Sequence, residues 1–316
     1  MMPETENVAV IGAGLMGHGI AQIFANQGYA VTLMDLEPAL LSEALKRIRS
    51  NLDLMAEKGI LDRKDIDPAL SRIRTTLSME EAAKGAGFIL EAVSENLELK
   101  QEVFRKLDSL SPPDTILATN TSVISITEIA SNSLHRERIV GTHFWNPPYL
   151  IPLVEVIRGR ETSSETMDRT YHLLQALGKH PVRVNKDVPG FVGNRLQHAL
   201  WREAISIVER GIADPATVDE CIRFGFGLRL PVLGPLENAD MVGTDLTLAI
   251  HDYILRHLES SPEPSPFLKK MVDRGDLGFK SGRGFQDWPP EEAEKSRKRL
   301  QEYLLEVTKD KRTWGK

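Results

Sequence analysis

The sequence predicts an α/β fold in which a doubly wound sheet is followed by an all-α C-terminal domain. Short apolar runs alternate with amphipathic segments up to residue 187, and the sequence beyond that point is helix-prone. Strands that alternate with helices form a parallel sheet with helices on both faces. The pattern changes at the linker Lys186–Gly190. We therefore expect one domain over residues 1–187 and a second over residues 188–316.

The composition favours a protein that acts on small molecules. The chain of 316 residues carries 39 basic and 45 acidic residues, and its net charge of −6 argues against a general nucleic-acid surface. Cys221 is the only cysteine, so there is no intramolecular disulfide and no CxxC metal pattern. No apolar run approaches the ~20 residues that span a bilayer, and the start of the sequence lacks a secretory pattern. We expect a cytoplasmic protein with no membrane partner.

A glycine-rich turn follows the first expected strand. The strand Asn7–Ile11 runs into Gly12, Gly14 and Gly17, after which an apolar helix begins. The first glycine allows a tight turn, the second lets the backbone approach a pyrophosphate, and the third lets helix and strand pack closely. The phosphates then lie at the helix N-terminus. This pattern predicts a Rossmann-type dinucleotide site, and the alternative is an ordinary βαβ unit with an empty turn.

The end of the second expected strand indicates which dinucleotide binds. The strand Tyr29–Met34 ends in Asp35, eighteen residues after Gly17. A carboxylate at this place can hold both ribose hydroxyls and would repel a 2′-phosphate, and Leu36 offers no arginine to receive one. We therefore expect NAD rather than NADP.

A long amphipathic helix is expected next, from Pro38 to about Lys58. Four basic residues of this helix form a ridge: Lys46, Arg47, Arg49 and Lys58. Such charges usually form a solvated face, and the alternative is an anion site.

Three further strands are expected at 73–76, 88–93 and 115–118, with a short helix capped by Ser78 and Glu81 after the first of them. Ligands of open α/β sheets bind beyond the carboxyl ends of the strands. Glu95 follows the strand over 88–93, where it can reach a nicotinamide or cap the helix over 97–110. Lys100 is expected to be an exposed residue of that helix. Residues 119–122 follow another end, as a ligand site or as a turn.

The most reactive pair of residues is expected on two apolar runs that can fold back on one another. His143 lies in the run over 139–144 and Glu155 in the run over 153–157, with Asn146-Pro147-Pro148 breaking the chain between them. A carboxylate in an apolar strand needs a partner, and an imidazole that takes up a proton is a suitable one. A structural histidine is the alternative.

The second half is expected to consist of helices. After a helix over 163–178 and a last short strand, HPVRV, long helices are expected over 191–211, from Asp214 onward, and over 237–258. His251 and His257 are expected at the surface because no acidic residues stand at ligand spacing. The charged stretch over 289–312 is expected to be a solvated helix, a helix that wraps a dimer partner, or partly disordered.

Seven short motifs in order identify the chain as similar to the L-3-hydroxyacyl-CoA dehydrogenases. They are IGAGLMG, ENLELK, ATNTS, HFWNPP, LVEVI, KDVPGFVGNR and KSGRGF. The resemblance implies an NAD-dependent oxidoreductase of fatty acid metabolism that forms a homodimer through its helical domain. It also implies that His143 is the general base and that Glu155 orients and stabilises its imidazolium.

The resemblance assigns the remaining site residues as well. With His143 and Glu155, it implies a catalytic set completed by Ser122, Asn146 and Asn194. The cofactor contacts that we expect are Gly12, Gly14, Gly17, Asp35, Glu95, Lys100, Ser122, Asn146 and Lys280. Substrate contacts are expected from Ser122, Asn194 and Lys58, and no metal is expected. Because the catalytic set is intact, a non-enzymatic NAD-binding protein is the least favoured interpretation.

Three features beside His143 depart from the usual acyl-CoA members of the family. Trp145 replaces a phenylalanine, Pro148-Tyr149 changes the turn, and Pro152 stands where a lysine is common. The expected substrate is a short L-3-hydroxyacyl-CoA of the 3-hydroxybutyryl-CoA type. The alternative is the same chemistry on a non-CoA hydroxy acid or aldehyde, such as carnitine, gulonate or a pyridine-carboxylate aldehyde.

Overall fold

A computed structural model describes residues 7–309 and divides the chain into two compact units, Met1–Arg195 and Leu196–Lys316. The division falls eight residues after the expected boundary at 187/188, because the segment that follows Gly190 still makes hydrogen bonds to a strand of the first unit. The functional boundary at 187/188 stays a prediction.

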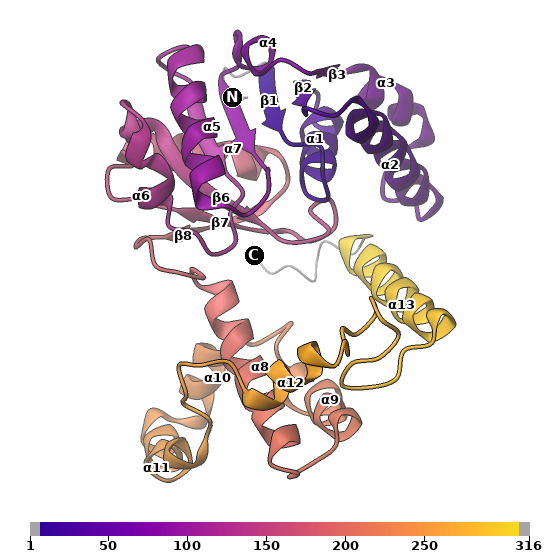
Figure 1. The fold of residues 1–316 in the computed structure, drawn as a ribbon, viewed down its shortest axis with the longest axis vertical. Coiled ribbons are helices and arrows are strands. Elements are labelled where there is room, and N and C mark those ends of the chain that lie inside the picture. The colour runs from indigo at the N-terminus through magenta and orange to yellow at the C-terminus, as the bar shows by residue number, and fades with distance from the viewer. Residues whose placement is uncertain (1–6, 310–316) are drawn as a thin grey trace. The chain divides into compact units, whose positions relative to one another are not determined.

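The first unit is built on one eight-stranded sheet with the order β3-β2-β1-β4-β5-β6-β7-β8 (Figure 1). The strands are β1 (Asn7–Ile11), β2 (Ala30–Met34), β3 (Ile73–Thr76), β4 (Phe88–Glu91), β5 (Ile116–Thr119), β6 (Ile139–Phe144), β7 (Leu153–Ile157) and β8 (His180–Val184). The first six are parallel, whereas β7 runs antiparallel to β6 and parallel to β8. The order 3-2-1-4-5-6 is that of a Rossmann sheet, so the predicted fold class is confirmed.

Helices cover both faces of this sheet. They are α1 (Gly17–Asn26), α2 (Pro38–Glu57), α3 (Ile66–Ser71), α4 (Met79–Ala83), α5 (Leu97–Leu110), α6 (Ile126–Ile129) and α7 (Ser164–Ala176). Because side chains alternate along a strand, Val8 and Val10 face the core under α1 and α2, whereas Ala9 and Ile11 face the core under α4 and α5. In Figure 1, α5 and α6 accordingly lie across the strands from α2 and α3.

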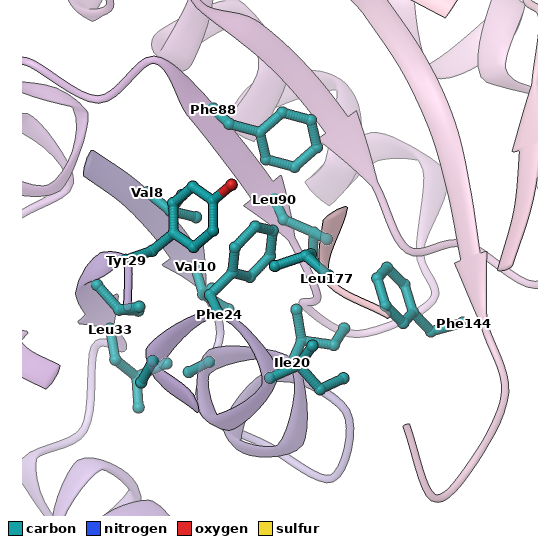
Figure 2. Close-up of a cluster of buried hydrophobic side chains, with 14 of the residues drawn as sticks. Val8, Val10, Ile20, Phe24, Tyr29, Leu33, Phe88, Leu90, Phe144 and Leu177 are labelled. Carbon is teal, nitrogen blue, oxygen red and sulfur yellow. The ribbon is translucent and has the colours of Figure 1, made fainter. Parts of the chain in front are cut away.

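The first of these cores lies directly behind the glycine-rich turn (Figure 2). Phe24 of α1 packs between Tyr29 and Phe88, with ring centroids 5.7 and 5.9 Å away. Phe144 joins the same core, so the alternation along β6 turns the preceding residue, His143, toward the opposite face. The core therefore fixes the strand that carries the candidate base.

Local sequence signals explain where several helices begin. Ser78 accepts a hydrogen bond from the Glu81 N–H at the start of α4, as the capping pattern predicts, and Asn96 accepts one from the Leu99 N–H at the start of α5. The expected helix over 97–110 and the expected strands over 139–144 and 153–157 have the observed bounds.

The second unit is helical apart from isolated bridges at Gly278–Arg283 and Arg283–Asp287 within its described residues. Its helices are α8 (Gly193–Glu209), which begins in the first unit, α9 (Pro215–Phe224), α10 (Pro235–Val242), α11 (Thr244–Ile254), α12 (Pro266–Asp273) and α13 (Pro290–Lys309). None of the helices described over residues 7–309 has the length and apolar content of a membrane span.

One helix prediction in this unit was wrong. The single helix expected over 237–258 is divided at Gly243, whose φ of +104° lies outside the range that helical residues adopt. His251 and His257 are exposed, as expected. The charged C-terminal stretch forms α13 up to Lys309, and the rest of it lies outside the described residues.

Candidate active site

The three glycines of the turn after β1 have different surroundings. Gly12 has a φ of +100°, and a Cβ there would lie 2.6 Å from the Ala92 carbonyl oxygen. A Cβ on Gly17 would lie 1.8 Å from the Gly12 carbonyl oxygen. Apart from its two chain neighbours, Gly14 has no protein atom within 4 Å of the place of its Cβ. The chain itself therefore requires the first and third glycines, whereas the second leaves open space where a ligand can approach the backbone.

A cavity of about 350 Å³ adjoins this turn, and its lining includes Gly12, Gly14, Asp35 and Ser94. Asp35 follows β2, and its Oδ2 accepts a hydrogen bond of 2.8 Å from the Ala13 N–H. The neighbouring Leu36 is largely exposed and brings no cation. Open backbone beside a carboxylate suits the pyrophosphate and ribose of NAD, so the residues present fit this cofactor.

Replacing Gly14 with alanine tests this assignment. The added methyl group meets no protein atom, so we expect the melting temperature to stay at the wild-type value. We expect NAD+ to bind at least about tenfold more weakly, because the methyl group occupies the space into which the pyrophosphate must come. Calorimetric titration with NAD+ measures the affinity. Gly234→Ala, which also places its methyl group in open space, is the matched control; unchanged affinity in Gly14→Ala would contradict the assignment.

Lys100 does not occupy the exposed position that was expected. Its side chain is fully buried, and its Nζ lies 2.7 Å from Glu91 and 3.4 Å from Glu95. Glu91 is also buried and accepts a further hydrogen bond from the Thr119 hydroxyl. Pairing with Glu91 compensates the cost of burying the ammonium group. The expectation of an exposed Lys100 was therefore wrong, because this residue is buried beside Glu95. Its contact with the cofactor stays a prediction.

Glu95 holds the loop that carries Ser122. Its Oε1 accepts hydrogen bonds from the Thr121 hydroxyl, the Ser122 N–H and the Val123 N–H at 2.6, 2.9 and 3.2 Å. Burial raises the pKa of Glu95, but these donors and the nearby Lys100 outweigh it and leave the pKa below its usual value. An ionised Glu95 thus fixes the loop after β5 at the carboxyl edge of the sheet.

Replacing Lys100 with methionine should destabilise the protein. The change leaves Glu91 as a buried carboxylate without its ammonium partner, for which we expect a loss of about 3–5 kcal/mol in the free energy of unfolding. Lys106→Met on the same helix is the control, since its exposed pair with Glu102 contributes only about 0–1 kcal/mol. Urea unfolding measures both variants, and equal losses would contradict the role given to the buried pair.

The antiparallel pairing of β6 with β7 places His143 directly opposite Glu155. Nδ1 of His143 lies 2.7 Å from Oε2 of Glu155, and the two residues are 4% and 1% exposed. Burial raises the pKa of Glu155, but hydrogen bonds from His143 and from the Gly193 and Val192 N–H groups outweigh it and lower the pKa below the usual value. Since an ionised carboxylate only accepts, Nδ1 carries the proton and Nε2 is able to take one up.

The other expected catalytic residues lie around this pair in different ways. The Asn194 side-chain amide donates to the Ser122 carbonyl oxygen at 2.9 Å, and Ser122 is an exposed residue. Asn146 is exposed after β6 and is joined to Pro147 by a cis peptide bond. The structure thus brings Ser122 and Asn194 together, whereas their contacts with a substrate stay predictions.

Sequence reasoning located Trp145 beside His143 but missed the other groups around the imidazole. The rings of Trp145 and Phe191 lie 5.2 and 5.9 Å from the imidazole. Backbone N–H groups of Val192 and Gly193 donate to Glu155. The Pro189-Gly190 pair in KDVPGFVGNR signals a tight turn, but the strand that this turn meets cannot be read from a local pattern.

Lys179 is another group that the sequence did not single out. Its Nζ donates to the carbonyl oxygens of Pro148 and Ile151, in the loop between the two strands of the His143–Glu155 pair. Burial lowers the pKa of Lys179 to about 8. Lys179 therefore holds two backbone carbonyl groups of this loop.

The expected ligand contacts also include two lysines, Lys58 and Lys280. Lys58 follows α2, and two members of the basic ridge on that helix are already paired, Arg47 with Glu43 and Arg49 with Asp67. Lys280 belongs to the second unit, where it lines an apolar cavity of about 620 Å³. The roles of both lysines stay predictions. Over the described residues, 7–309, no group of histidine, cysteine and carboxylate side chains has the arrangement of a metal site.

Comparison with known proteins assigns both parts of the chain. Residues 7–188 match the family model "3-hydroxyacyl-CoA dehydrogenase, NAD binding domain", and residues 190–288 match "3-hydroxyacyl-CoA dehydrogenase, C-terminal domain". The chain belongs to the 3-hydroxyacyl-CoA dehydrogenase family. It is therefore an NAD-dependent oxidoreductase, as the resemblance in the sequence implied.

Individual members of the 3-hydroxyacyl-CoA dehydrogenase family resemble the chain over most of its length. It is 42% identical over 286 residues to a probable 3-hydroxybutyryl-CoA dehydrogenase of Bacillus subtilis, covering 90% of this chain and 98% of that protein. It is 37% identical over 300 residues to the 5-formyl-3-hydroxy-2-methylpyridine 4-carboxylate 5-dehydrogenase of Mesorhizobium japonicum, covering 92% and 95%.

Solved structures of the family give the same two kinds of relative. A crystal structure of a 5-formyl-3-hydroxy-2-methylpyridine 4-carboxylic acid 5-dehydrogenase, an NAD+-dependent dismutase, has a TM-score of 0.88 at 34% identity, with 96% of this chain and 97% of that chain covered. An (S)-3-hydroxybutyryl-CoA dehydrogenase from Ralstonia eutropha has a TM-score of 0.76 at 36% identity, with 90% and 100% covered.

Proposed function

We propose that this dehydrogenase oxidises the 3-hydroxyl group of a short L-3-hydroxyacyl-CoA, of the 3-hydroxybutyryl-CoA type, to the 3-keto product. The observation that carries the proposal is the buried pair of His143 and Glu155, at 2.7 Å, in a chain that matches both domains of the family. The similarity to the 3-hydroxybutyryl-CoA dehydrogenase of Bacillus subtilis supports the substrate class.

The proposed reaction uses the pair as a general base. Nε2 of His143 takes the proton of the substrate hydroxyl, and Glu155 stabilises the imidazolium that forms. NAD+, when bound, would accept the hydride from the carbon that bears this hydroxyl group. Asn194 and Ser122, which are joined by a hydrogen bond, orient the hydroxyl, and Asn146 contacts the neighbouring carbonyl or the nicotinamide.

A non-CoA substrate is the second candidate. It is favoured by the TM-score of 0.88 to the pyridine-carboxylate aldehyde enzyme, compared with 0.76 to the acyl-CoA enzyme. Trp145, Tyr149 and Pro152, which depart from the acyl-CoA pattern, belong to the loop that joins the strands of His143 and Glu155. With a smaller pocket at this loop, the same base would act on the hydroxyl of a free hydroxy acid, or on a hydroxyl of the hydrate that an aldehyde forms with water.

A substrate panel separates the two candidates. Reduction of NAD+ is followed with L-3-hydroxybutyryl-CoA, carnitine, gulonate and a pyridine-carboxylate aldehyde. Fast turnover of the thioester alone supports the first candidate, and turnover of a free acid or aldehyde alone supports the second. Absence of turnover with every compound contradicts both.

The assembly that goes with this proposal is a homodimer formed through the helical unit. Large apolar side chains are exposed over α9 to α11 and the turns that join them: Phe224, Leu228, Val232, Leu236, Met241, Leu248 and Tyr253. An apolar surface of this extent is typical of a subunit interface. Placing the protein in the cytoplasm and in fatty acid metabolism stays a prediction that accompanies the acyl-CoA substrate.

Charged substitutions test the dimer. The double variant Leu236→Asp, Leu248→Asp should sediment as a monomer where the wild type sediments as a dimer. Both side chains are more than half exposed in the single chain, so dimer formation would bury the two new carboxylates without partners. Leu134→Asp, on an exposed residue of the first unit, should leave the assembly unchanged. A monomeric wild type would contradict the proposal.

A further inference from the structure

The carboxylate of Glu155 is bound by the segment through which the chain enters α8. Its Oε1 accepts hydrogen bonds of 2.9 Å from the Val192 N–H and 3.0 Å from the Gly193 N–H, and its Oε2 faces Nδ1 of His143. Successive backbone N–H groups that converge in this way form a concavity that binds an oxyanion. One carboxylate oxygen is thus fixed by backbone, and the other is left for the imidazole.

The backbone before these N–H groups has an unusual conformation. The Phe191 N–H donates to the Val188 carbonyl oxygen at 3.0 Å, so Pro189 and Gly190 form the centre of a tight turn, with Gly190 at a φ of 76°. Phe191 itself has a φ of 48°, which costs a bulky residue about 1–3 kcal/mol. Its ring is buried against His143. The strained residue therefore directly precedes the two N–H groups that bind Glu155.

Gly193 allows this segment to lie against Trp145. A Cβ on Gly193 would come within 2.5 Å of Cζ2 of Trp145 and 3.4 Å of Oε2 of Glu155. The indole ring is itself part of the site, since it lies 5.2 Å from the imidazole of His143. A side chain at residue 193 would have to displace either the indole ring or the backbone N–H groups.

We infer that the Val192 and Gly193 N–H groups are positioning groups for the reaction, and that the left-handed Phe191 and the contact of Gly193 with Trp145 set their direction. By binding Oε1 of Glu155, they aim Oε2 at Nδ1 of His143, which keeps the proton on Nδ1 and leaves Nε2 as the base. This inference rests on the proposed role of His143 and Glu155, which it deepens.

A pair of substitutions tests the inference. In Gly193→Ala the methyl group meets Cζ2 of Trp145, so we expect the N–H groups to move away from Glu155. In Trp145→Phe the atom Cζ2 is absent, and the buried indole N–H, which has no hydrogen-bond partner, is removed at little cost. Trp145→Phe alone is the reference for the pair and should keep the hydrogen bond between Glu155 and His143. Compared with this reference, the double variant should restore what Gly193→Ala loses.

The first readout requires no substrate. A proton on Nδ1 that is hydrogen-bonded to a carboxylate gives a downfield NMR resonance, which His143→Gln identifies by its absence. We expect this resonance in the wild type, in Trp145→Phe and in the double variant, and we expect it to be lost or shifted in Gly193→Ala. A wild-type resonance in Gly193→Ala would overturn the inference. If Gly193→Ala does not fold, a double variant that folds without the resonance would overturn it equally.

The second readout is the pH dependence of kcat/KM with L-3-hydroxybutyryl-CoA and NAD+. Gly193→Ala should lower kcat/KM by about 10–100-fold, as expected for a displaced catalytic pair. Its acid limb should move to higher pH, because the pair binds its proton more tightly once two donors to the carboxylate are lost. Recovery in the double variant supports the inference, and lost activity with an unmoved acid limb contradicts it. A fully active His143→Gln would instead refute the proposed function.

Discussion

Replacing His143 with glutamine should lower kcat by about 10³-fold or more, because the change removes the imidazole that takes up the proton of the substrate hydroxyl. Binding of NADH should be retained, since the glycine turn and Asp35 lie on other strands of the sheet. Steady-state kinetics give the rate, and fluorescence titration gives the affinity for NADH.

A histidine outside the pair is the control for this variant. His172→Gln makes the same chemical change on the exposed side of α7 and should keep wild-type turnover. Normal turnover in His143→Gln would contradict the catalytic assignment. Loss of NADH binding would show that the substitution had disturbed the structure of the first unit.

Replacing Glu155 with glutamine should lower kcat by about 10²–10⁴-fold while leaving the fold intact. The amide oxygen can accept the two backbone N–H groups at the place of Oε1, which turns the amide NH₂ toward Nδ1 of His143. The imidazole must then carry its proton on Nε2, the wrong tautomer for a base. Glu165→Gln, an exposed change on α7, is the control. Wild-type kcat in Glu155→Gln would contradict the role of the carboxylate.

The lowered pKa of Glu155 also gives the direction of a stability change. The folded chain keeps this carboxylate ionised at pH values where the unfolded chain already binds the proton. Its contribution is therefore complete above the ordinary pKa of a glutamate and is lost as the pH falls through the lower folded value. Thermal unfolding from neutral to acid pH should show that the wild type loses more stability than Glu155→Gln.

The sequence predicted those features that depend on local patterns. Alternating apolar residues located the strands, and the glycine spacing located the dinucleotide turn. The pairing of the strands that carry His143 and Glu155 was also predicted, because a proline break between two apolar runs allows an antiparallel pair. These features require only neighbours along the chain.

Features that depend on distant contacts were not predictable in this way. A lysine in an amphipathic helix is normally exposed, but Lys100 lies over β4 and is buried by its pair with Glu91. The break at Gly243 was missed because a single glycine is often tolerated within a helix. The N–H groups that bind Glu155 belong to backbone, which leaves no mark in residue identity.

The most direct test of the proposed chemistry follows the hydrogen that leaves the substrate. L-3-Hydroxybutyryl-CoA with deuterium at carbon 3 is incubated with NAD+ and enzyme, and the reduced cofactor is examined by mass spectrometry. The proposed reaction predicts that each reduced cofactor formed by the wild type carries one deuterium. In the same time, His143→Gln should form almost no reduced cofactor. Reduced cofactor without deuterium, or equal transfer by the two enzymes, would contradict hydride transfer assisted by His143.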